Sequence, residues 1–242
     1  MNARVLQSIG VILTALPALV GCQVQVGDGK PQSTGLQRFL PPTPADRAKQ
    51  AFNMENADQR REGIVGLSKN AWGLKEPYLK GYALLSTDPE PAVRSAAINA
   101  LGRAGDATYL PQIVKCLEDA SDMVRLDAAI ALDNVHGEQA VEPLRRHATR
   151  EASLDVRTRS IHALRAYKTT PVIETLVSGL TDEDFGVRHA TRATLAEMTG
   201  QDYGYDISVW KEHLASNKTP FAATAPAASG PWWDWLGVTR KK

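Results

Sequence analysis

The chain has 242 residues, of which 43% are hydrophobic and 23% charged, and its formal net charge is +1. This composition is typical of a soluble globular protein, and it excludes a largely disordered chain and a protein with many membrane spans. The near-neutral charge argues against a generic DNA or RNA binder, because neutralising phosphates requires a basic surface. The length predicts one or two domains.

The N-terminus has the layout of an export signal, with Arg4 ahead of a mostly apolar run that ends at Val20. That run is too short to span about 30 Å of hydrocarbon comfortably as a helix. It is followed by Gly21 and Cys22, and the stretch Leu-Val-Gly-Cys resembles a bacterial lipobox. The resemblance implies cleavage after Gly21 and a lipid on the Cys22 thiol. The alternative is a plain secretory signal with a chance cysteine.

We therefore expect residues 1–21 to be a lipoprotein signal peptide and the mature protein to be lipid-anchored in the bacterial cell envelope. Gln23 stands where an Asp would resemble an inner-membrane retention signal, which weakly favours the outer membrane. Residues 22–42 are rich in Gly and Pro and have little apolar periodicity. This composition predicts a flexible tether.

Internal repeats determine the predicted fold. A Val-Arg pair recurs at a spacing of 31 or 32 residues, and we call its arginine the repeat arginine. The four copies are Arg94, Arg125, Arg157 and Arg188, and Arg60 marks a weaker first copy. In the four clear copies, small residues lie three and six positions after the repeat arginine and a leucine lies seven positions after it. Positions three, four and seven share one helical face, and small residues there allow a neighbouring helix to approach closely.

A second apolar helix is predicted in each unit, at 78–85, 110–117, 141–148 and 172–180. One such helix pair cannot bury both of its faces, so the units must stack. We therefore predict an all-α protein, an α-solenoid of about five helix pairs over residues 43–216. Thr43 and Pro44 open an N-terminal capping helix, and a helix containing Trp210 and Leu214 closes the C-terminal end.

The repeat pattern resembles the HEAT-repeat family, in particular its short repeats called PBS-lyase HEAT-like. An acid lies six residues before each of the four repeat arginines, and in HEAT repeats such an acid caps a helix and pairs with an arginine. The resemblance implies a structural ladder of Asp88, Arg94, Asp119, Arg125, Glu151, Arg157, Asp182 and Arg188. Met54 replaces the acid before Arg60, and Glu151 replaces Asp, so we expect the ladder to be weaker at these two places.

The segment from Met198 to Ser216 closes the repeats and is similar to the closing segment of HEAT-repeat proteins from planctomycete-type bacteria. Tyr203 and Tyr205 in this segment either complete the cap or line a site. A basic stretch at 145–150 is either a solvated helix end or a contact for an acidic partner.

No catalytic, metal-binding or cofactor-binding motif stands out, so we expect no cofactor and no enzymatic activity. The five histidines lack the His-Glu pairs that HEAT-like iron hydroxylases use, and no zinc-ligand spacing occurs. Cys116 lies in an apolar helix. It is either a buried, inert thiol or, in the alternative reading, a reactive nucleophile or chromophore anchor.

The last 26 residues, 217–242, combine an Ala- and Pro-rich linker with an aromatic and basic end. Flexible linkers normally lack large apolar groups, so we expect this end to contact a surface. A membrane, a partner protein and the solenoid's own groove remain open as its destination. The candidate contact residues are Trp232, Trp233, Trp235 and Leu236.

Together these features predict a membrane-anchored scaffold that binds an unknown protein or peptide through HEAT repeats, without catalysis. A bilin-lyase-like enzyme or accessory protein is one alternative, since bilin lyases share this short repeat. A purely structural organiser of the cell envelope is the other.

Overall fold

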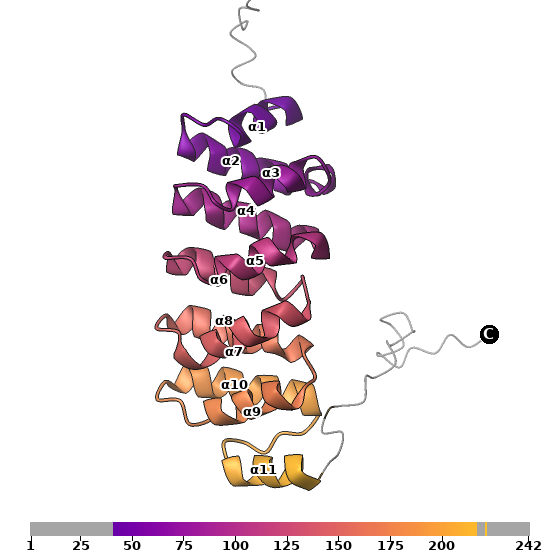
Figure 1. Cartoon of the computed structure of the whole chain (residues 1–242), viewed down its shortest axis with the longest axis vertical. Helices are drawn as coiled ribbons and strands as arrows, with labels where there is room; N and C mark the ends of the chain where they lie inside the picture. Colours follow the sequence, from indigo (N-terminus) through magenta and orange to yellow (C-terminus); the bar gives the residue numbers. More distant parts are fainter. Residues whose placement is uncertain (1–40, 217–220, 222–242) are drawn as a thin grey trace, which may run out of the picture. The chain divides into compact units, whose positions relative to one another are not determined.

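The computed structural model describes residues 41–216 and residue 221, and in this part of the chain every regular element is helical (Figure 1). The helices are α1 (Pro44–Ala51), α2 (Ala57–Ser68), α3 (Tyr78–Leu85), α4 (Pro91–Ala104), α5 (Leu110–Cys116), α6 (Asp122–Ala131), α7 (Val141–Arg150), α8 (Leu154–Ala163), α9 (Thr170–Gly179), α10 (Phe185–Thr199) and α11 (Ile207–Ser216). Short 3-10 turns lie ahead of α3, α5, α7 and α9.

The helices alternate between two layers (Figure 1). The repeat arginines lie on α2, α4, α6, α8 and α10, which pack against one another in that order and form the first layer. Helices α3, α5, α7, α9 and α11 form the second layer. The predicted all-α solenoid is confirmed, and the second helix of each unit lies within two residues of its predicted bounds.

Small side chains bring the helices of the first layer close together. Ala97, Ala128 and Thr191, three residues after their repeat arginines, are completely buried. At Gly102 of α4 the approach is closer still, because a Cβ there would lie 2.5 Å from the Cβ of Ala131 on α6. The repeat thus requires small residues at these positions for steric reasons.

The core runs without interruption between the two layers. The leucines seven residues after the repeat arginines are fully buried, namely Leu101, Leu132, Leu164 and Leu195. Ile113 and Leu144 contribute the same kind of fully buried side chain from the second layer. Each unit therefore buries its apolar face against its neighbours, which is how a solenoid gains stability.

Both ends of the stack carry a cap. At the start of α1, Thr43 accepts a hydrogen bond from the Asp46 N–H at 3.2 Å, and the Asp46 carboxylate accepts one from the Thr43 N–H at 3.1 Å. This reciprocal pair satisfies donors that a helix N-terminus leaves free. At the other end, Trp210 of α11 is completely buried and donates from its indole to the Gly204 carbonyl at 3.0 Å.

Several predicted features lie outside the described residues. These are the signal peptide, Cys22 and most of the tether at one end, and the aromatic segment with Trp232, Trp233, Trp235 and Leu236 at the other. Within the described part of the chain, no helix is both long and apolar enough to cross a membrane.

Candidate functional site

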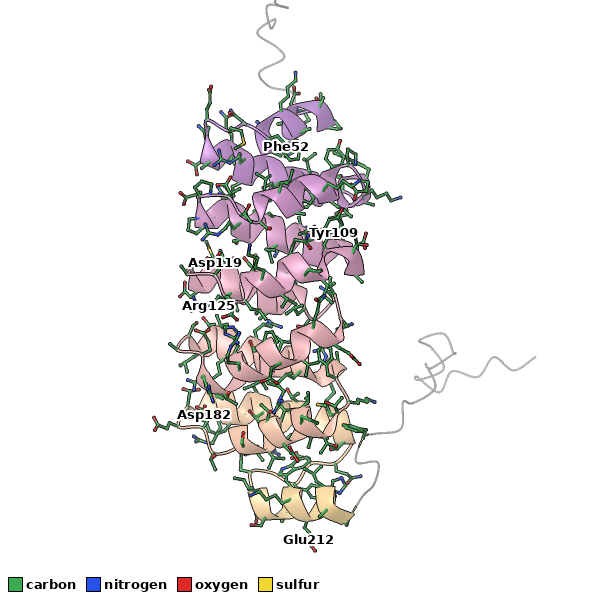
Figure 2. The ribbon with its side chains drawn as sticks, viewed as in Figure 1. Phe52, Tyr109, Asp119, Arg125, Asp182 and Glu212 are labelled. Carbon is green, nitrogen blue, oxygen red and sulfur yellow. The ribbon has the colours of Figure 1, made fainter. Side chains whose placement is uncertain are left out.

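An Arg–acid ladder runs along one edge of the stack, where Asp119, Arg125 and Asp182 are seen one above another (Figure 2). Each rung joins a repeat arginine to an acid of the following unit, 25 to 28 residues later in the chain. Arg94 donates from Nε and Nη2 to Asp119, both at 2.7 Å. A bidentate pair of this kind is among the stronger polar contacts that proteins form.

The same residues also hold the loops within each unit. Arg94 Nη1 donates to the backbone carbonyl of Asp88, six residues earlier, at 2.8 Å. The Asp119 carboxylate accepts the Ser121 N–H at 2.9 Å, and the other ladder acids accept the corresponding N–H two residues later. Each ladder acid therefore has two roles. It shapes the loop before the arginine of its own unit, and its carboxylate binds the guanidinium of the arginine in the preceding unit.

The ladder begins one rung earlier than the sequence suggested. Arg60 forms a bidentate pair with Asp88 at 2.8 and 3.0 Å and also donates to the backbone carbonyl of Met54 at 3.0 Å. The expected weak point at Met54 is absent, because that position supplies only a backbone oxygen, which any residue can provide. Arg60 and Asp88 are also the most buried charged residues of the described part of the chain.

The expected weakening of the ladder at Glu151 is also absent, because its carboxylate is well supplied with hydrogen-bond donors. It receives Arg125 at 2.9 and 3.0 Å, the Ser153 N–H at 3.0 Å and the His147 ring at 2.8 Å. Burial alone would raise the pKa of Glu151, but these hydrogen bonds outweigh it and lower the pKa to about 2. The weaker place is the next arginine, Arg157, which makes a single bond to Asp182 and has a buried Nε without a partner.

The basic stretch at 145–150 is largely neutralised within the molecule. Arg145 pairs with Glu142 at 2.8 Å, and Arg146 pairs with Glu118. His147 is buried between two carboxylates, with Nδ1 2.8 Å from Glu151 and Nε2 3.1 Å from Glu118. These contacts favour a structural role for this stretch over a free basic surface.

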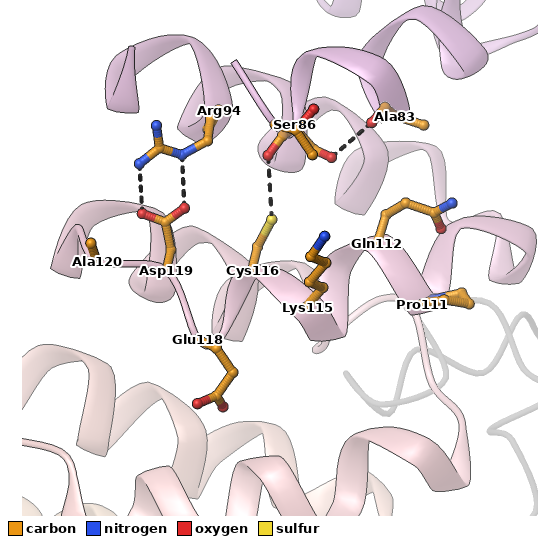
Figure 3. A pocket seen from close by; sticks show the side chains of 11 residues that line it. Ala83, Ser86, Arg94, Pro111, Gln112, Lys115, Cys116, Glu118, Asp119 and Ala120 are labelled. Carbon is orange, nitrogen blue, oxygen red and sulfur yellow. Dashed lines mark hydrogen bonds and ion pairs between the residues drawn. The ribbon is translucent and has the colours of Figure 1, made fainter. Parts of the chain in front are cut away.

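A depression of about 620 Å³ lies between α3 and α5 on the second layer (Figure 3). Cys116 lies in its wall, with its sulfur 3.8 Å from the Ser86 carbonyl. Burial raises the pKa of the Cys116 thiol to about 11, so the thiol is protonated at neutral pH. A protonated, buried thiol is a poor nucleophile, which favours the structural reading of Cys116.

Two further depressions lie on the exposed face of the first layer and flank α6. One, of about 340 Å³, spans α2, α4 and α6 and includes Met123 and Asp127. The other, of about 690 Å³, spans α6, α8 and α10 and includes Leu126 and Ile130. Together they extend across the five helices of the first layer, from α2 to α10, and we call this surface the first-layer groove. Its apolar floor and scattered charged side chains suit an extended ligand.

Asp127 is the unusual residue of the first-layer groove. Burial raises its pKa, and its hydrogen bonds to the neutral side chains of Ser95 and Asn99 only partly oppose this shift. The carboxylates of the ladder, by contrast, each pair with an arginine, namely Asp88, Asp119, Glu151 and Asp182. No Lys, Arg or His of the described residues forms an ion pair with Asp127. Sequence reasoning missed this residue, because nothing in its repeat position marks it as unpaired.

The described residues hold no group of three or more His, Cys, Asp or Glu side chains that could bind a metal ion.

At the C-terminal cap, Tyr203 packs on Trp210 with ring centroids 5.0 Å apart, and the Tyr203 hydroxyl lies 3.0 Å from Nδ1 of His213. Tyr203 is therefore part of the cap, whereas Tyr205 remains partly exposed.

The fold and the ladder define a HEAT-like α-solenoid. A family model described as HEAT repeats matches residues 82–165, which supports a HEAT-like domain in this part of the chain. A comparison with curated proteins finds no match.

Solved structures share the fold at low sequence identity. The complex of CpcE and CpcF of phycocyanin lyase from Nostoc sp. is 19% identical with a TM-score of 0.52, covering 63% of this chain and 99% of that one. An engineered protein is 19% identical with a TM-score of 0.56, covering 72% and 90%. A computationally designed armadillo repeat protein for modular peptide recognition is 19% identical with a TM-score of 0.50, covering 72% and 87%. These similarities show the fold alone.

Proposed function

We propose that this protein is a lipid-anchored scaffold of the bacterial cell envelope that binds an extended segment of a partner protein in the first-layer groove and has no catalytic activity of its own. The observation that carries the proposal is the first-layer groove itself. Its two depressions of about 340 and 690 Å³ follow the same face of successive repeats. The armadillo repeat protein designed for modular peptide recognition offers a precedent for this use of a related fold.

The repeats separate a constant frame from a variable surface. The buried positions three, six and seven residues after each repeat arginine are small or leucine in every clear copy. The position five residues after it lines the groove and is exposed or half-buried, and its chemistry changes from Asn99 to Ile130, His162 and Ala193. A surface that varies on a constant frame provides a different contact at each repeat, as recognition of a defined segment requires.

Asp127 indicates one feature of the partner. A half-buried carboxylate held only by neutral donors gains from a cationic or strongly donating group. We infer that a Lys or Arg side chain of the bound segment lies against Asp127, with apolar side chains on Leu126 and Ile130. Lipid on Cys22 would hold the scaffold at the membrane, where its partner would be found.

A photo-crosslinking residue in place of Ile130 in the anchored protein tests the proposal in the living bacterium. We expect a defined protein adduct, and we expect Asp127→Lys to abolish it. The same residue in place of Leu84 on α3, which is 77% exposed, is the positional control. Glu138→Lys, at an exposed acid outside the groove, is the charge control. Equal adducts from both positions, or an adduct that survives Asp127→Lys, would contradict the proposed groove.

The bilin-lyase alternative is less well supported. The structural similarity to CpcE and CpcF is at 19% identity and is a similarity of fold. The single thiol of the described residues, Cys116, is buried and has a raised pKa, so it is poorly suited to attaching a chromophore. Mixing the purified protein with a bilin and recording its absorption separates the two readings.

A further inference from the structure

The ladder ends on an arginine that is prepared for a carboxylate but has none. Arg188 donates from Nη1 to the backbone carbonyls of Asp182 and Glu183 at 2.7 and 3.0 Å, in the same way as Arg60, Arg94 and Arg125. In those three arginines, Nε and Nη2 then bind an acid of the next unit. No carboxylate within residues 41–216 forms an ion pair with Arg188.

The repeat geometry explains why the last rung is incomplete. Ladder acids lie 25 to 28 residues after their arginine, just beyond the second helix of the next unit. The corresponding positions after Arg188 begin at His213, and α11 ends at Ser216 without an acid between them. Glu212 lies on the outer side of α11, away from the stack (Figure 2).

The acids of the loop before α11 are already engaged. Asp202 forms a bidentate pair with Arg192 at 2.8 and 2.7 Å. Asp206 accepts the Ser208 N–H at 2.8 Å at the start of α11. The outward edge of the Arg188 guanidinium is therefore a preformed carboxylate site, and four rungs of the same molecule show how such a group is bound.

Exposed aromatic rings surround this site. Phe185 is 61% exposed, and the guanidinium carbon of Arg188 lies 5.5 Å from its ring centroid. The ring centroids of Tyr205 and Phe185 are 6.3 Å apart, and the guanidinium carbon of Arg192 lies 5.1 Å from the Tyr205 ring centroid. Aromatic faces next to a guanidinium favour a ligand in which a carboxylate is flanked by further aromatic groups.

We propose that Arg188 binds the carboxylate of Asp234 from the tail of the same chain, which thereby supplies the missing rung. Asp234 is the one acidic side chain after Glu212 in the sequence, and it lies between Trp233 and Trp235. From Ser216 to Asp234 an extended chain reaches about 60 Å at about 3.3 Å per residue. Helix α11 is only about 15 Å long at about 1.5 Å per residue, so the tail can return along it to Arg188.

This pairing would bring Trp233 and Trp235 next to the exposed rings of Phe185 and Tyr205. The tail then contacts the solenoid rather than a membrane or a partner, which were the other destinations that the sequence left open. The site lies at the ladder edge, and its three residues do not line the first-layer groove, which reaches Asp184 and Gly186 beside Phe185. Its test follows the tail tryptophans and needs no partner, so it is independent of the proposed partner binding.

Collisional quenching of tryptophan fluorescence tests the contact in the chain from residue 22 onwards with Cys22→Ser. Trp72→Phe is included so that, with Trp210 buried, the tail provides the quenchable signal. We expect Arg188→Gln and Asp234→Asn each to raise the acrylamide quenching constant about twofold, and the double variant to raise it no further. Arg150→Gln, at an exposed arginine, is the matched control and should leave it unchanged.

Arg188→Gln also removes the hydrogen bonds of Arg188 to its own loop, and this loss could by itself change the quenching constant. Asp234→Asn keeps those bonds and therefore tests the proposed pair alone. An unchanged quenching constant in Asp234→Asn, or additive effects in the double variant, would overturn the proposal. So would a dimer in which Asp234 binds a second copy, seen as a quenching constant that depends on protein concentration. The proposal would also be overturned if anionic vesicles with brominated acyl chains quenched the tail tryptophan fluorescence of the protein that retains Arg188 and Asp234.

Discussion

Arg60 and Asp88 form the most buried ion pair of the solenoid, with side chains 6% and 1% exposed and Nε 2.8 Å from Oδ2. The pair joins α2 to the loop before α4 and anchors the first unit to the second. Breaking such a pair leaves an uncompensated charge in the interior, which costs far more than the loss of a surface contact.

We expect Arg60→Ala to lower the free energy of unfolding by about 3–5 kcal/mol, because Asp88 would remain buried without its guanidinium. Arg61→Ala changes the neighbouring arginine, whose nearest acid, Glu62, is 3.9 Å away at an exposed position. This control should change the free energy of unfolding by less than about 0.5 kcal/mol. Urea unfolding followed by circular dichroism measures both, and equal effects would show that the first rung is not structural.

Glu151 predicts a pH dependence of stability. Its pKa is lowered from 4.5 to about 2 in the folded protein, so its ionised form stabilises the fold above pH 4.5. This contribution is lost as the pH falls from 4.5 towards 2, because in this range the unfolded state takes up a proton that the folded state does not bind. We expect Glu151→Gln to cost about 1.5–3 kcal/mol at pH 7 and progressively less between pH 4.5 and pH 2.

Unfolding curves of Glu151→Gln and the unsubstituted protein across this pH range measure the difference. Glu138→Gln, at an exposed acid, should run parallel to the unsubstituted protein throughout. A constant difference at all pH values would mean that the carboxylate charge of Glu151 does not contribute.

The helices could be predicted from the sequence because their signals are local. The period of apolar residues placed one helix at Tyr78–Leu85, which is where α3 lies. Thr43, Pro44 and Asp46 marked the start of α1, because capping depends on residues within one turn. The small residues three and six positions after each arginine predicted a close helix–helix approach for the same reason.

The pairing within the ladder could not be predicted in the same way. The spacing of six residues between Asp119 and Arg125 reflects a loop contact, whereas the ion pair of Arg125 reaches Glu151 in the next unit. That choice depends on the rise and rotation between repeats, which a single sequence does not give. The same holds for Asp127, since its lack of an ion pair among the described residues depends on how α2, α4 and α6 pack, although Arg61 and Arg103 line the same depression.

The lipid anchor predicts a processing defect. Cys22→Ser removes the thiol that the lipobox resemblance marks for acylation, so the precursor should keep its signal peptide and lose its lipid. Mass spectrometry of the N-terminal peptide and membrane fractionation measure both. Cys116→Ser retains the lipobox and is the control. An unacylated N-terminus in the unsubstituted protein would contradict the anchor.

Cys116 should be unreactive in the folded protein. Its sulfur is buried against the Ser86 carbonyl and its pKa is raised to about 11 by burial, so little thiolate exists at pH 8. In the chain that carries Cys22→Ser, we expect a disulfide reagent to label Cys116 at least about a hundredfold more slowly than in urea, following the thiolate fraction and access. Fast labelling of the native protein would reopen the reading of Cys116 as a nucleophile.

Gly102 should reverse the usual preference of helices for alanine. In an open helix, Gly→Ala stabilises by about 1 kcal/mol. At Gly102 the new Cβ would lie 2.5 Å from the Cβ and 2.7 Å from the Cα of Ala131, so α4 and α6 would be forced apart. We expect Gly102→Ala to destabilise the protein by about 1–3 kcal/mol. Combining it with Ala131→Gly removes one of the two clashing methyl groups and should restore part of this loss. Thermal unfolding of the two single variants and the double variant gives the coupling between the sites, and additive effects would show that the helices do not meet at these residues.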